Sequence, residues 1–157
     1  MLKPAWYLIT ETDYWSGLTQ SPRLPKAPAL MAALDELFGN EAGLNPARTT
    51  TAVEVMLRMA EHLSDAVPHA QVAIADVPHA ARLLLGLNLL TAHLAQMTAR
   101  LADHANAITG PDLTNLSDRD RQALARSLAT VSRWLEDSAA LFKDAHLATA
   151  GADRRHP

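Results

Sequence analysis

Apolar residues recur at helical spacing along most of the chain, and helix start and stop signals divide this pattern into four segments. Asn45 followed by Pro46 is a typical start, because the asparagine side chain caps the first turn and proline fits its first position. Pro68 ends the helix that begins there, since proline disrupts a helix interior. The pattern predicts one short helix and three long ones, at about residues 28–38, 46–66, 76–110 and 117–149.

The last two predicted helices carry the clearest repeat, with apolar residues spaced alternately by four and three positions. This heptad spacing places a stripe of side chains along one face of a helix. The link between the helices is short, which favours antiparallel neighbours. We therefore expect a helical hairpin in which Leu94 lies opposite Val131. The predicted leucine seam consists of Leu83, Leu87, Leu90, Leu94, Met97, Leu101, His104 and Ile108 on one helix, and Leu124, Leu128, Val131, Leu135, Ser138, Phe142 and Ala145 on the other.

Helix 76–110 is expected to be the central element, because its first half is apolar on every side. Residues 83–90 include six leucines, and helices of this character are usually buried all round. Further along, small residues form a stripe on the side opposite the leucine seam, which would let another helix approach closely. This stripe consists of Ala92, Ala95, Ala99 and Ala102.

Composition supports an all-helical class. The 157-residue chain has 30 alanines and 25 leucines but only 6 valines and 3 isoleucines, whereas strands are rich in β-branched and aromatic residues. The predicted fold is an all-α antiparallel bundle of three long helices and one short helix, with a non-helical aromatic N-terminal segment. Residues 1–26 are expected to form that extended segment, 27–150 the bundle and 151–157 a frayed tail.

Charge and cysteine content exclude several classes of function. The formal net charge of −3 offers no basic field to nucleic acid, and there is no cysteine for a disulfide, a thiolate nucleophile or a cysteine-based metal site. The longest uncharged apolar stretch, 83–99, is 17 residues long and includes polar side chains, so no membrane span is expected. We expect a soluble cytoplasmic protein with no nucleic-acid or membrane partner.

Patterns typical of catalytic and metal-binding residues are absent from the sequence. There is no Glu-x-x-His pair, no His-Glu-x-x-His, no Gly-x-Ser-x-Gly and no glycine-rich phosphate loop. His93 and His104 would lie about 16 Å apart along one helix, too far to share an ion. We therefore expect no metal and no cofactor, and we assign no catalytic residue.

One tetrapeptide, Val-Pro-His-Ala, occurs at 67–70 and again at 77–80. His69 and His79 could be paired ligands, or an acid–base couple at one end of the bundle. The alternative is that Val-Pro stands at helix boundaries because proline belongs there, which makes the repeat a coincidence. We favour this second interpretation.

Four of the seven aromatic residues lie within the first 15 positions, where the sequence has no helical period: Trp6, Tyr7, Tyr14 and Trp15. We interpret this segment as an internal strap that covers surplus leucine surface on helix 76–110. It could also be an arm that docks onto a partner, since Trp and Tyr are frequent interface anchors. Both interpretations hold if two copies exchange arms.

The surplus of apolar surface on helix 76–110 leads to the functional hypothesis. We expect a non-enzymatic protein that acts through protein–protein association, as a homodimer or with a protein partner, because large exposed apolar patches are uncommon on monomers. The expected interface residues are Leu84, Leu85, Leu89, Trp6 and Trp15. The alternative is a small-molecule-binding bundle, enzymatic or not. Its pocket would be lined by Trp6, Tyr14, Trp15, His93 and Trp134.

Overall fold

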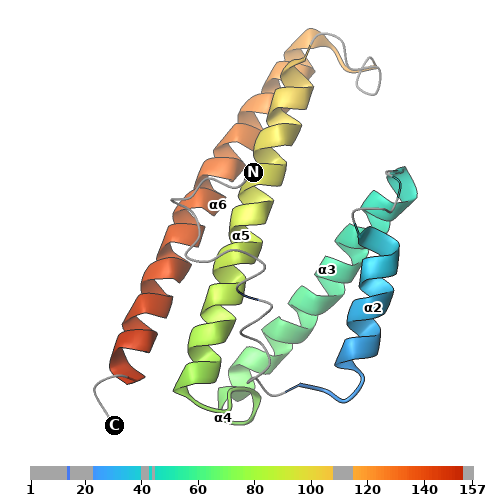
Figure 1. Cartoon of the computed structure of the whole chain (residues 1–157). Coiled ribbons are helices and arrows are strands. Elements are labelled where there is room, and N and C mark those ends of the chain that lie inside the picture. Colours follow the sequence, from blue (N-terminus) through green and yellow to red (C-terminus); the bar gives the residue numbers. More distant parts are fainter. Residues whose placement is uncertain (1–13, 15–22, 40–42, 44, 108–114, 154–157) are drawn as a thin grey trace. The chain divides into compact units, whose positions relative to one another are not determined.

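Every regular element that the structure describes is a helix (Figure 1), as the composition predicted. The computed structural model describes residues 14, 23–39, 43, 45–107 and 115–153. The elements are α2 (Ala27–Phe38), α3 (Pro46–Ala66), the 3₁₀ helix η2 (Val67–His69), α4 (Ala70–Ala73), α5 (Val77–Asn106) and α6 (Asp118–Asp153). They belong to two compact units: residues 20–75 contain α2 to α4, and residues 1–19 with 76–157 contain α5 and α6.

Helix starts follow the capping chemistry that the sequence predicted. In three helices a side-chain oxygen accepts a hydrogen bond from the backbone N–H three residues further on, which satisfies a donor of the first turn. The pairs are Asn45 with Arg48 (2.9 Å), Asp76 with His79 (2.7 Å) and Ser117 with Asp120 (3.2 Å). Helix α3 ends at Ala66 as predicted, and α6 continues to Asp153, beyond the predicted end at Thr149.

Helices α5 and α6 lie side by side and run antiparallel (Figure 1). Three hydrogen bonds cross between them, each joining a side chain of one helix to a main-chain carbonyl of the other. They are Asn88 Nδ2 to Ala139 O (2.8 Å), Ser132 Oγ to Ala95 O (2.9 Å) and His146 Nδ1 with Ala81 O (2.8 Å). In these pairs the residue number on α6 falls as the residue number on α5 rises, so the two helices run antiparallel.

Small residues fill the contact between α5 and α6. Ala92, Ala95 and Ala139 are fully buried at its centre, and the partly buried Leu135 packs against them. The distance between packed helices depends on the side chains at the contact, so these residues bring the two backbones close. We call the residues at every seventh position of this contact the small-residue seam. It consists of Ala81, Asn88, Ala95 and Ala102 on α5, and Ala125, Ser132, Ala139 and His146 on α6.

The predicted leucine seam on helix 76–110 is wrong. Leu90, Met97 and Leu101 remain 42%, 41% and 46% exposed, and α6 packs against the alanine stripe that was predicted to lie on the other side. Where Leu94 was expected opposite Val131, the structure has Ala95 opposite Ser132. The physical reason is the close approach that alanine permits: three polar side chains bond main-chain carbonyls across the contact, and leucines would hold the backbones too far apart for this.

Close packing at the small-residue seam predicts a strong difference between two neighbouring alanines. Ala139 is fully buried, whereas Ala140 is exposed. Ala139→Leu should lower the free energy of unfolding by about 1–3 kcal/mol, because the added atoms have no space. Ala140→Leu should change it by less than about 0.5 kcal/mol. Denaturant unfolding followed by circular dichroism measures both, and equal effects would contradict the seam.

Candidate functional site

The clearest candidate for an interaction site is the side of the α5–α6 hairpin formed by residues that directly precede the small-residue seam. In two antiparallel helices, the residues just before the facing positions point to the same side of the pair. Most of these residues are large and apolar. We call this side the leucine flank: Ala80, Leu87, Leu94 and Leu101 of α5, and Leu124, Val131, Ser138 and Ala145 of α6.

The opposite side of the hairpin, formed by residues that directly follow the seam, has a different character. We call it the charged flank: Arg82, Leu89, Gln96 and Asp103 of α5, and Arg126, Arg133, Ala140 and Leu147 of α6. Asp103, Arg126 and Arg133 are exposed there. The hairpin therefore has one apolar side and one largely polar side, and the contact between α5 and α6 covers neither side.

Exposure on the leucine flank is high for apolar residues. Leu101, Leu124 and Val131 are exposed, while Leu87 and Leu94 are half-buried. Trp134 and Leu141, each two positions after a seam residue, lie on the side of α6 away from α5 and are 65% and 69% exposed. The apolar strip of the leucine flank consists of Leu87, Leu94 and Leu101 of α5 with Leu124 and Val131 of α6.

The structure places the three leucines of the predicted interface, Leu84, Leu85 and Leu89, in different surroundings. Leu85 and Leu89 are buried within the chain, and Leu84 is half-buried. Leu84 lies on the side of the leucine flank, because helical spacing places it between Ala80 and Leu87, whereas Leu89 lies on the charged flank. The other two predicted interface residues, Trp6 and Trp15, lie outside the described residues. An interface formed by this set stays a prediction.

The aromatic pocket that formed the alternative prediction is only partly described. Trp134 lies on the side of α6 away from α5, and His93 lies on the side of α5 away from α6, so the two point away from each other. Tyr14 lies against α5 at Gly86. Trp6 and Trp15 lie outside the described residues, so a pocket that includes them stays a prediction.

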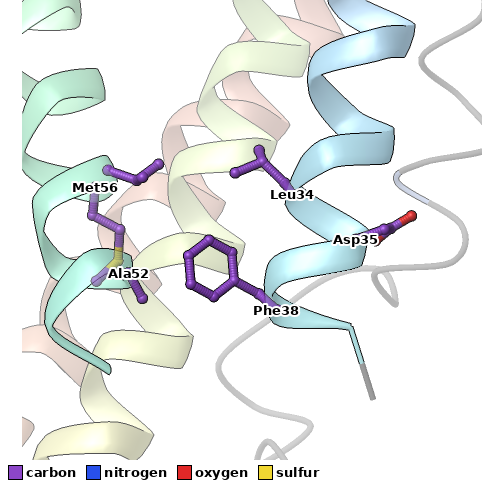
Figure 2. Close-up of a pocket in the computed structure, with 6 residues that line it drawn as sticks. Leu34, Asp35, Phe38, Ala52 and Met56 are labelled. Atoms are coloured by element: carbon purple, nitrogen blue, oxygen red, sulfur yellow. The ribbon is translucent and has the colours of Figure 1, made fainter. Parts of the chain in front are cut away.

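A hollow that the sequence did not predict lies between α2 and α3, within the other unit. Figure 2 shows Leu34 and Phe38 of α2 pointing toward Ala52 and Met56 of α3, while Asp35 points away. The hollow measures about 290 Å³ and is also lined by Val55. An alanine at position 52, facing larger side chains, is the residue that leaves this space; no motif marks it in the sequence.

Polar chemistry does not gather at this hollow or elsewhere in the described part of the chain. No cluster of three or more His, Asp or Glu side chains able to hold a metal ion occurs among the described residues. His69 is exposed at the end of η2, and His79 is half-buried in the first turn of α5, where its backbone N–H bonds Asp76. A shared role for these two histidines stays untested.

Comparison of the chain with protein-family models, with curated proteins and with solved structures found no match in any of the three. Among the described helices, none combines the length and the apolar character that crossing a membrane requires. The function is therefore inferred from the side chains of this chain alone.

The hollow between α2 and α3 predicts that adding atoms there is favourable. Ala52→Leu should raise the free energy of unfolding by about 0.5–2 kcal/mol, because the new side chain fills space beside Phe38 and Met56. Ala60→Leu, at an exposed site of the same helix, is the matched control and should have little effect. Denaturant unfolding tests the pair, and destabilisation by Ala52→Leu would show that the hollow is already filled in solution.

Proposed function

We propose that this chain is a non-enzymatic helical protein that acts through protein–protein association, and that its leucine flank binds a second copy of the chain. The observation that carries the proposal is the arrangement of side chains around the hairpin. The α5–α6 contact uses small residues, and large apolar residues are left on the outside. An exposed apolar strip of this length is typical of an interaction surface.

The energetic argument follows from the sizes of the buried side chains. Burying one methyl group contributes about 0.8 kcal/mol, whereas burying a whole leucine contributes about 1.5–3 kcal/mol. The small-residue seam therefore obtains less from hydrophobic burial than leucines would provide, and Leu101, Leu124 and Val131, which stay 46%, 36% and 37% exposed, still have apolar surface to bury. A partner that covers Leu101, Leu124 and Val131 would gain the free energy of burying their exposed apolar surface.

A second copy suits the leucine flank because the flank can face itself. None of its eight residues is charged, so two copies would meet without like-charge repulsion. A twofold axis parallel to the helices would place α5 of one copy beside α6 of the other, again antiparallel, in a four-helix arrangement. The charged flank carries Arg126 and Arg133, which would oppose the same contact on that side.

The proposal extends to the packing of the helices with one another. We propose that the helices form the antiparallel bundle expected from the sequence, with the aromatic N-terminal segment alongside. Two apolar surfaces support it. Leu83, Leu90 and Met97 lie on the side of α5 away from α6, and α3 carries an exposed apolar stripe of its own at Val53, Leu57 and Leu63. Each surface offers the other a partner distinct from the leucine flank.

The small-molecule alternative has less support. The hollow described above lies between α2 and α3, and polar groups do not converge on it, since Asp35 is the single charged residue of its lining. Ligand pockets usually combine apolar walls with a few convergent polar groups. A cytoplasmic location stays a prediction from composition.

Mass in solution tests the proposed dimer. Light scattering at micromolar concentration should give twice the 17.0 kDa mass of one chain. The double variant Leu101→Glu with Val131→Glu should give the mass of one chain while keeping its helical circular dichroism, because two charges per copy would enter the contact and both sites are exposed in the single chain.

The matched control is Leu147→Glu, an exposed leucine on the charged flank, which should leave the dimer intact. A native mass of one chain would refute self-association and leave the leucine flank to another segment or partner. Loss of the dimer in Leu147→Glu alone would move the interface to the charged flank.

A further inference from the structure

One leucine on the charged flank is almost completely buried, whereas the other residues of that flank are half-buried or exposed. Leu89 is 5% exposed, whereas Asp103, Arg126, Arg133 and Leu147 on the same flank are exposed. Leu89 directly follows the seam residue Asn88, so it does not point at the centre of the α5–α6 contact. Residues other than those of the seam must therefore cover part of the Leu89 side chain.

The structure places an aromatic side chain one helical turn before Leu89, at Gly86 on the side of α5 away from α6. Tyr14 packs against Gly86 of α5 so closely that a Cβ atom at Gly86 would lie 2.6 Å from the tyrosine hydroxyl oxygen and 3.2 Å from the ring carbon that bears it. Real Cβ atoms essentially never approach other atoms within 3.0 Å. Tyr14 is itself half-buried. The missing side chain of Gly86 therefore makes room for the phenol.

We propose that Gly86 is a docking notch for Tyr14, and that this contact fastens Tyr14 to α5 as a strap that covers Leu89. Two independent observations carry the proposal: the space that only glycine leaves at position 86, and the near-complete burial of Leu89 one helical turn further along α5. The strap shields the apolar centre of the charged flank. The strap does not depend on dimer formation.

Glycine inside a long helix gives this proposal a test with a definite sign. Gly→Ala in a helix interior is normally stabilising, since alanine has the higher helix propensity. For a chain of this length the gain corresponds to a rise of about 2–4 °C in melting temperature. With Tyr14 in the notch, the new methyl group must push the phenol away, and this loss opposes the gain.

The experiment is a double-mutant cycle on the full chain. Gly86→Ala in the native background should leave the melting temperature unchanged or lower it. In the Tyr14→Ala background, the same substitution should raise it by about 2–4 °C. Tyr14→Phe, which lacks the hydroxyl nearest the notch, should give an intermediate result. Tyr14→Ala should also increase the fluorescence of an apolar-surface dye such as ANS, because it uncovers Leu89.

An equal rise in melting temperature in both backgrounds would overturn the proposal, since it would show that the notch is empty in solution. Unchanged dye binding in Tyr14→Ala would overturn the covering of Leu89. Coupling measured at a protein concentration where light scattering gives a single chain assigns the strap to its own chain. Coupling that disappears on dilution would instead mean that Tyr14 docks on a second copy, and would contradict an internal strap.

Discussion

The close contact between α5 and α6 is the constraint on which the rest of the hairpin depends. Alanines at its centre allow the two backbones to approach until Ser132 donates to the carbonyl of Ala95 and Asn88 donates to that of Ala139. Asn88 is the largest fully buried side chain among the described residues. A buried amide has to find its partner, so these bonds favour one rotation and one register over the alternatives in which Asn88 would be buried against apolar side chains.

This contact also decides where the large apolar residues can lie. Since the small residues face α6, helix geometry turns Leu87, Leu94 and Leu101 to one flank and the charged residues to the other. The same placement of small residues at the α5–α6 contact thus gives close packing inside the hairpin and leaves an apolar outer surface. The proposed association is a consequence of that surface, and the Tyr14 contact at Gly86 lies one helical turn from Leu89 of the opposite flank.

The sequence was sufficient for the helices but not for their rotation. Capping residues such as Asn45 and Asp76 act locally, so their effect can be read from neighbouring positions. The choice between the leucine stripe and the alanine stripe of α5 is not local, because both have heptad spacing and both can face a helix. Hydrophobicity favoured Leu94, whereas close approach and interhelical hydrogen bonds favoured Ala95, and those bonds depend on residues 37 to 65 positions away. The hollow beside Ala52 depends likewise on which side chains of α2 and α3 meet.

Disulfide trapping tests the small-residue seam most directly, because the chain has no cysteine of its own. A variant with Ala95→Cys and Ser132→Cys should form an intrachain disulfide on mild oxidation, since these two positions face each other across the close contact. A variant with Leu90→Cys and Leu135→Cys, a pair that the leucine pattern would bring together, should keep two free thiols, because Leu90 lies on the side of α5 away from α6. The reverse outcome, with a disulfide between 90 and 135 and none between 95 and 132, would contradict the account.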